Sequence, residues 1–226
     1  MAITIQQLID KALVRPEREG SGKYKPSLFG RCYRLQFWAR KNEPESDPPD
    51  ERTLRTFKCG NLFEDFVKQA IMKQDGQWLD GNQDGLVIEC DDVKGFADLI
   101  GPNEVFDFSR SFWWKEKEIK EGRDIREICR HNWLQVMYYV RELHKEFGRL
   151  VFISKDDLCI AEYVQKWDYS WVLELQAELG VLRDFWADKI LPPAEPRCFK
   201  NSKGEYKECQ YCSFVSLCRK IEGEKK

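Results

Sequence analysis

The sequence contains no long hydrophobic run. No stretch approaches the roughly 18 consecutive apolar residues of a transmembrane helix, so we expect no contact with a membrane interior. The first residues, MAITIQQLIDKALVRPE, also lack the basic start, apolar block and small-residue cleavage site of a signal peptide. We therefore expect a cytoplasmic protein.

The sequence also lacks an excess of positive charge. Its net charge of −2 argues against a general nucleic-acid coat. The charges are unevenly distributed, however. Residues 1–41 carry nine Lys/Arg against three Asp/Glu and residues 197–226 carry eight against four, whereas residues 42–196 sum to −12. Basic ends around an acidic centre suit a protein whose ends contact phosphate and whose centre holds cations, although ordinary solvated surface charge would give the same counts.

Nothing in the composition indicates disorder. Apolar residues make up 42% of the chain and aromatic residues 13%, which is enough for a packed core. At 226 residues the chain suits one sizeable domain with appendages or two small ones. The nine cysteines are an odd number in a protein that we expect in the cytoplasm. Metal or iron–sulfur chemistry is therefore a better explanation for them than a disulfide framework.

The periodicity of apolar residues predicts an α/β domain. We expect helices over residues 3–15, 28–41, 52–73, 121–147 and 168–191, and strands over residues 86–90, 94–100, 104–109, 149–155 and 158–166. This order predicts one central mixed sheet flanked by helices. The acidic, proline-rich residues 42–51 are the best linker candidate. We expect an N-terminal helical segment (1–41), a core (52–191) and a cysteine-rich tail (192–226).

Three acids occur where a cation site can form. Glu64 lies on the expected helix 52–73, Asp98 near the end of one strand and Asp107 on the next. A short turn between antiparallel strands can place Asp98 beside Asp107, and both have apolar neighbours. Unpaired carboxylates are costly there, and Mg²⁺ or Mn²⁺ is a natural partner for them. Each acid taken alone can also be an edge charge or pair with an arginine.

Two polar residues follow on the next helix. Gln135 and Tyr139 are four positions apart and therefore share one helical face. Their side chains can hold a scissile phosphate or a flanking base without adding charge. Because polar residues four apart are common in helices, the pair carries weight only together with the acids.

In this order and spacing, the segments GNLFEDF, GFAD, VFDFS and QVMYY resemble the RecB-like nucleases of the PD-(D/E)XK superfamily, with a restriction-endonuclease-like core. The chain is most similar to the CRISPR-associated and phage RecB-like exonucleases, over roughly residues 28 to 220. The matching residues are Gly60 and Glu64 in Gly-x-x-x-(His/Glu), Gly95 and Asp98 in Gly-x-x-Asp, Asp107 in Asp/Glu-x-Lys, and Gln135 and Tyr139 in Gln-x-x-x-Tyr.

This resemblance implies a DNA exonuclease that hydrolyses phosphodiesters with Mg²⁺ or Mn²⁺ held by Glu64, Asp98 and Asp107. We expect single-stranded or end-frayed DNA as its substrate. CRISPR adaptation, phage recombination and repair are all compatible with the resemblance, and each would supply protein partners.

One family position is missing, because Ser109 stands where the third motif has lysine. Lys68, one turn after Glu64 on the same helical face, is our first candidate to replace that lysine, and Lys115 is a second. Alternatively, metal alone activates the water, or the chain is a weakened nuclease fold that binds DNA or a partner as an adaptor.

The tail carries a C-x2-C-x5-C run formed by Cys209, Cys212 and Cys218. Three thiolates leave a four-ligand site one ligand short. The resemblance implies a [4Fe–4S] cluster whose fourth ligand is Cys32, which would join the N-terminal helix to the tail. The two basic ends would then form one surface of charge +10, a track for DNA.

Two alternatives stay open at this site. Zn²⁺ can use the same four thiolates, and Cys198 can replace Cys32 as the fourth ligand. The other cysteines, Cys59, Cys90, Cys129 and Cys159, lie in apolar segments, and we expect buried side chains there.

Overall fold

The computed structural model describes residues 4–14, 20–74, 77–81, 86–109, 122, 124–154, 157–200 and 203–223. Its helices are α1 (Ile5–Ala12), η1 (Pro26–Leu28), α2 (Tyr33–Lys41), α3 (Glu51–Gln74), α5 (Ile125–Ile128), α6 (Arg130–Glu142), α7 (Tyr169–Ala187), η2 (Glu208–Tyr211) and α8 (Val215–Gly223). Its strands are β1 (Leu79–Asp80), β2 (Ile88–Cys90), β3 (Val93–Gly95), β4 (Leu99–Ile100), β5 (Glu104–Ser109), β6 (Phe147–Ile153) and β7 (Ile160–Lys166). Within these ranges, no helix combines the length and apolar character needed to cross a membrane.

Five strands form a mixed sheet in the order β1-β4-β5-β6-β7. Strands β5 and β6 run parallel, and the other neighbours are antiparallel. The parallel pair requires a crossover, which α6 provides by packing on β5 and β6. The expected α/β class with a central mixed sheet flanked by helices is therefore confirmed.

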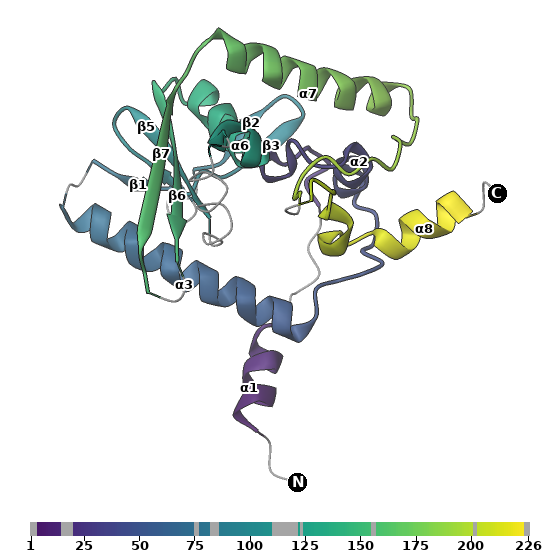
Figure 1. Ribbon diagram of the computed structural model, residues 1–226, viewed down its shortest axis with the longest axis horizontal. Helices are drawn as coiled ribbons and strands as arrows, with labels where there is room; N and C mark the ends of the chain where they lie inside the picture. Colours follow the sequence, from purple (N-terminus) through teal and green to yellow (C-terminus); the bar gives the residue numbers. More distant parts are fainter. Residues whose placement is uncertain are drawn as a thin grey trace.

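Each face of this sheet has its own core. On one face, α6 and α7 cover side chains that include Val105 of β5 and Leu150 of β6. On the other face, Val67 of α3 packs against Phe106 and Phe108 of β5. Successive strand residues alternate between faces, so Asp107 points to the face covered by α6. Helices α3 and α7 accordingly lie on opposite sides of the molecule (Figure 1).

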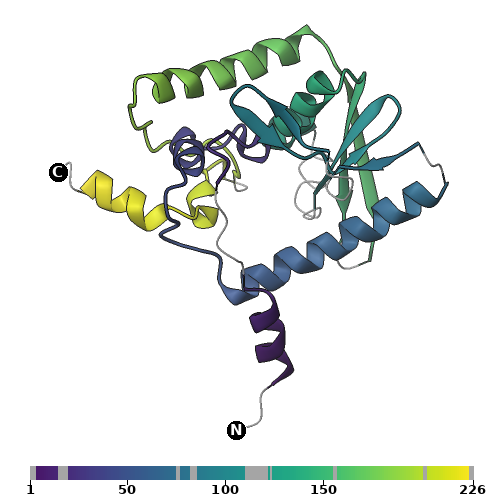
Figure 2. The ribbon, with the colours of Figure 1, turned by 180° about the vertical axis from the view of Figure 1, so that it is seen from behind.

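The strand predicted over 94–100 is interrupted. Its first part, β3, pairs with β2 in a separate two-stranded sheet, and its last part, β4, pairs with β1 and β5. The chain changes sheets at Phe96–Asp98, so the prediction of one continuous strand and a single sheet was wrong. The β2–β3 hairpin lies beside α6 instead (Figure 2).

The single helix predicted over 121–147 was also wrong. The described part of this range holds two helices, α5 and α6, and α6 ends at Glu142. His144 has a left-handed backbone, with φ of 52°, and the following N–H of Lys145 donates to Val140 O at 2.9 Å. This C-terminal cap turns the chain away from the helix, so that Phe147 can begin β6.

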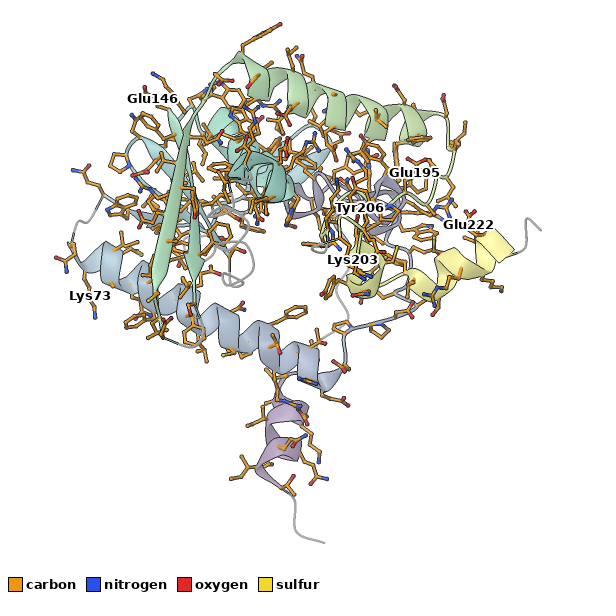
Figure 3. The ribbon with its side chains drawn as sticks, viewed as in Figure 1. Lys73, Glu146, Glu195, Lys203, Tyr206 and Glu222 are labelled. Atoms are coloured by element: carbon orange, nitrogen blue, oxygen red, sulfur yellow. The ribbon has the colours of Figure 1, made fainter. Side chains whose placement is uncertain are left out.

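Helix α2 and the tail pack together, at a distance from the end of α3 that carries Lys73 (Figure 3). Helix α1, the other helix of residues 1–41, contacts α3 instead. Leu35 and Trp38 of α2 and Phe214 of the tail form their shared core. The expected linker 42–51 is irregular but anchored, because Asp47 Oδ2 accepts from the Ser216 N–H at 2.7 Å.

Two buried acids strengthen this junction. Glu178 of α7 accepts from the Gly30 N–H at 2.8 Å and pairs with Arg197 at 2.7 Å. Glu208 of the tail accepts from the backbone N–H groups of Cys32 and Arg197, both at 2.7 Å. Buried carboxylates are stable when such donors surround them. The loop before α2, helix α7 and the tail are therefore held in one arrangement.

Candidate active site

Two of the candidate acids, Asp98 and Asp107, lie on neighbouring segments of the sheet, and the third, Glu64, comes from α3. Asp107 is buried on β5, and its Oδ2 accepts from Asn132 Nδ2 of α6 at 3.0 Å. Asp98 precedes β4, and its Oδ2 accepts from the backbone N–H of Phe108 at 2.9 Å. The register that pairs Leu99 with Phe106 continues to Asp98 and Asp107 and so places them side by side.

Negative charge is concentrated around Asp98. Burial of its carboxyl raises the pKa of Asp98 well above the usual value, and the nearby charges of Asp107 and Glu64 raise it further. The N–H of Phe108 and the charge of Lys68 lower this pKa without cancelling the rise. Glu64, Asp98 and Asp107 therefore form one electrostatic unit whose negative charge Lys68 offsets only in part, and a divalent cation would offset it further.

Lys68 lies at the edge of this unit and is only 2% exposed. Its Nζ pairs with Glu64 Oε1 at 2.9 Å and with Asp80 Oδ2 at 3.1 Å. Burial alone would lower the pKa of Lys68, but its bonds to these two carboxylates outweigh burial and raise the pKa. Lys68 is therefore a charged, fixed side chain that orients Glu64.

Asp80 is a site residue that the sequence analysis missed. It is buried, and it occupies a two-residue strand in a segment that otherwise indicates turns. The sequence carries no signal for it, because only the buried position of Lys68 shows that this lysine has a second carboxylate partner. Of the other candidate lysines, Lys115 lies outside the described residues. Ser109 ends β5 and is partly exposed.

Tyr139 supports the segment that carries Asp98. It is 2% exposed and is hydrogen-bonded to the backbone of Phe96. Burial raises its pKa well above the usual value, and the charges of Asp98 and Asp107 add to this. A Cβ added at Gly95 would lie 2.4 Å from the Tyr139 hydroxyl, so Gly95 permits this close approach. Gln135, one turn earlier on α6, is partly exposed.

The four cysteines predicted as cluster ligands lie in one neighbourhood. Cys32, at the start of α2, packs with Cys212 and Cys218 around the core shared by α2 and the tail. Burial raises the pKa of Cys212, and the charges of Cys32 and Cys209 contribute. All four are free thiols. Across the described ranges, no three His, Cys, Asp or Glu side chains are grouped so as to hold a metal ion as they stand.

The remaining cysteines differ in burial, and Cys90, which we expected to be buried, is only partly buried. Cys198 is buried, and the groups that act on its pKa are Glu208 and Arg31 rather than the other cysteines. Cys129 is fully buried, as expected. The prediction of burial was wrong for Cys59 and Cys159, which are exposed. Each lies at a solvent-facing position, on α3 and beside the β6–β7 turn respectively, where apolar sequence neighbours do not guarantee burial.

Solved structures share this fold. SSO0001 superposes with a TM-score of 0.55 at 17% identity, over 95% of this chain and 96% of that one. A phage-related exonuclease from Haemophilus somnus 129PT gives 0.51 at 10% identity, over 80% and 92%. The alkaline exonuclease LHK-Exo from Laribacter hongkongensis gives 0.47 at 12% identity, over 75% and 90%.

The first two superpositions show that this chain shares its fold with SSO0001 and with a phage-related exonuclease, as the resemblance to phage exonucleases predicted. No protein-family model matches the sequence, and no curated protein matches it.

The contact between Gly95 and Tyr139 gives a first prediction. We expect Gly95→Ala to lower the free energy of unfolding by about 1–3 kcal/mol in urea denaturation, because the new methyl overlaps the Tyr139 hydroxyl. Tyr139→Phe should recover part of this loss. Gly180→Ala is the matched control, since no atom lies within 4 Å of its added Cβ. Equal effects of the two glycine substitutions would contradict the packing described for Gly95.

The raised pKa of Asp98 gives a second prediction. The folded state binds this proton more tightly than the unfolded chain does, so the stability it contributes is present at low pH. That stability is lost as the pH rises from about 4, the unfolded value, through the raised folded value. An asparagine at this position would stay neutral at every pH, and its side-chain oxygen can still accept from the Phe108 N–H.

We therefore expect Asp98→Asn to raise the free energy of unfolding at pH 7–8 and to change it little near pH 4. Urea denaturation in a chelating buffer measures both. Asp184→Asn, which alters an exposed acid on α7, is the control and should leave the free energy of unfolding unchanged at each pH. An increase in the free energy of unfolding that is the same at pH 4 and at pH 7–8 would contradict the raised pKa of Asp98.

Proposed function

We propose that this protein is a metal-dependent DNA exonuclease that acts on single-stranded or end-frayed DNA. The observation that carries the proposal is the antiparallel register that places Asp98 beside Asp107, in a fold shared with a phage-related exonuclease. Burial and the charges of Asp107 and Glu64 accordingly raise the pKa of Asp98. Acids gathered so closely that their charges raise the pKa of a buried neighbour are a common arrangement for binding divalent cations.

The donor set fits Mg²⁺ or Mn²⁺, because all three candidate ligands are carboxylates. Asp98, Asp107 and Glu64 would hold the ion. When bound, the ion polarises the scissile phosphate, favours deprotonation of the attacking water and neutralises the leaving oxygen.

The protein's own residues prepare this site. Asn132 and the Phe108 N–H fix the carboxylates of Asp107 and Asp98. Lys68 fixes Glu64, and its burial favours a positioning role over contact with the water. We propose that it compensates in this way for the lysine that Ser109 replaces. Gln135, partly exposed on α6, is the candidate for contact with the phosphate or a neighbouring base.

Cleavage of end-labelled single-stranded DNA with Mn²⁺ by anaerobically purified protein tests the proposal. We expect Asp98→Ala to reduce the rate by at least about 100-fold, because a metal ligand contributes several kcal/mol to the transition state. Asp184→Asn, remote and exposed, should cleave like the wild type. If the wild type and Asp98→Ala were equally inactive but both bound DNA, the result would favour the adaptor alternative.

The same assay tests Lys68. Lys68→Met alone would remove the cation that Glu64 and Asp80 share, so Lys68→Met is combined with Asp80→Leu to preserve the fold, as melting curves can verify. We expect the double variant to lose most activity and Ser109→Lys to add little. A large gain from Ser109→Lys, with an active double variant, would show that the chain is a weakened nuclease and that Lys68 has no part in cleavage.

We further propose that Cys32, Cys209, Cys212 and Cys218 hold a [4Fe–4S] cluster. Donors beside their sulfurs support it: the Phe214 N–H donates to Cys212 Sγ and Arg34 Nη1 to Cys218 Sγ, both at 3.4 Å. Such donors stabilise thiolate ligands. The basic ends would then meet at the cluster and could follow a DNA strand.

Metal analysis of protein purified without oxygen tests this site. We expect brown protein with stoichiometric iron and sulfide, and loss of both in Cys212→Ser. Cys59→Ser, which changes an exposed cysteine on α3, should retain iron. A colourless protein with zinc and no iron would show that the four thiolates hold zinc instead of the cluster. If Cys32→Ser retained iron and Cys198→Ser lost it, the fourth ligand would be Cys198 rather than Cys32.

A further inference from the structure

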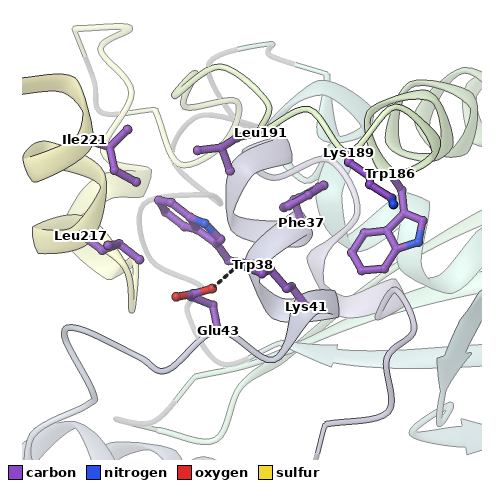
Figure 4. A pocket seen from close by; sticks show the side chains of 9 residues that line it. All are labelled: Phe37, Trp38, Lys41, Glu43, Trp186, Lys189, Leu191, Leu217 and Ile221. Atoms are coloured by element: carbon purple, nitrogen blue, oxygen red, sulfur yellow. Dashed lines mark hydrogen bonds and ion pairs between the residues drawn. The ribbon is translucent and has the colours of Figure 1, made fainter. Parts of the chain in front are cut away.

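A cavity of about 560 Å³ lies away from the acids, where α2, the end of α7 and α8 meet (Figure 4). Its volume is in the usual range of small-ligand sites. Aromatic side chains from α2 and α7 and aliphatic side chains from α8 and the segment after α7 supply most of the lining. The residues that line it are Phe37, Trp38, Lys41, Glu43, Trp186, Lys189, Leu191, Leu217 and Ile221.

Trp186 provides a flat surface that is already held in place. The Arg40 guanidinium lies 4.1 Å from the centre of its ring, and the Phe37 ring lies 5.3 Å away on another side. Arg40 is itself fixed by Asp92 at 3.2 Å. Trp186 is only partly buried, so a planar ligand can reach it. A side chain fixed in this way loses little entropy when a ligand stacks on it.

The exposed side chain of Lys189 adds a positive charge to the same cavity. Lys189 is exposed and has no carboxylate partner in the part of the chain that the structure describes. Its φ of 56° is a left-handed conformation that glycine adopts more readily just after a helix. The other lysine of the cavity, Lys41, is paired with Glu43 at 2.9 Å, so Lys189 gives the cavity its net positive charge.

From these features we propose that the cavity binds an unpaired nucleotide of single-stranded DNA, with its base stacked on Trp186 and its phosphate beside Lys189. Aromatic rings and a free cation are what such sites combine. This inference rests on the proposed nuclease function and adds a strand-holding site outside the carboxylate centre. The basic character of residues 1–41 favours an anionic occupant over an uncharged one.

A second copy of the chain is the competing occupant. Helix α1 exposes Ile5 at 77% and Leu8 at 51%, and it projects from the body in both views (Figures 1 and 2). Such an apolar helix could enter a groove on another copy. Nothing in the cavity's charge favours this occupant, and the experiment below separates it from DNA.

The test measures binding of a fluorescein-labelled oligo-dT, in EDTA so that no cleavage occurs, by anisotropy and by quenching of tryptophan. We expect Trp186→Leu to weaken binding by about 5- to 100-fold, the effect of losing one stacked base. Lys189→Gly should weaken binding and reduce the slope of log K against log salt by about 0.7, the effect of one phosphate contact. Its melting temperature should not fall, because glycine suits that backbone.

Two controls match Lys189→Gly. Lys73→Gln removes an exposed charge from the far end of α3 (Figure 3), and Leu158→Gly changes another left-handed exposed residue, with φ of 60°. Both should bind DNA as the wild type does.

The outcomes separate the two proposals. Wild-type cleavage together with unchanged affinity and salt slope in Trp186→Leu and Lys189→Gly would overturn the cavity assignment and leave the nuclease function intact. Weakened binding in both variants without any wild-type cleavage would support the cavity site and refute the nuclease. The third outcome concerns oligomers. If the wild type sediments as an oligomer, and both Leu8→Asp and Trp186→Leu abolish the oligomer but leave DNA affinity unchanged, the cavity binds a second copy of the chain.

Discussion

Burial of acidic side chains is the constraint on which both parts of this molecule depend. At the junction of α2, α7 and the tail, Glu178 and Glu208 are about 1% exposed but accept from backbone N–H groups and from Arg197. These acids are paired, and they hold segments far apart in sequence in one arrangement. A buried acid without such donors would instead work against folding.

The acids beside β5 differ in their electrostatics, and this difference distinguishes the candidate site from the structural junction. Asp98 accepts from one backbone N–H, but the charges of Asp107 and Glu64 still raise its pKa. Lys68 is shared between Glu64 and Asp80 and cannot neutralise the whole group. The fold thus tolerates a local excess of negative charge, which costs stability unless a cation is bound.

The sequence predicted most of the longer helices and strands, the mixed sheet and the placing of Asp98 beside Asp107, because apolar periodicity and short turns are local properties. It did not predict the break at Phe96–Asp98, where one strand serves two sheets, since that depends on which strands are available as partners. Asp80 was missed for a related reason: only the tertiary position of Lys68 shows that this lysine needs a second acid. The exposed Cys59 likewise shows that an apolar segment need not bury each member.

Under the proposed function, the arrangement also accounts for the serine that stands where the third motif has lysine. Ser109 removes a cation from β5, but Lys68 supplies one from α3, one turn from Glu64. A lysine on a strand is free to approach water, whereas Lys68 is 2% exposed and tied to two carboxylates. In the proposed function, Lys68 therefore replaces the charge of the missing lysine better than its reach, and activation of water would depend more heavily on a bound metal.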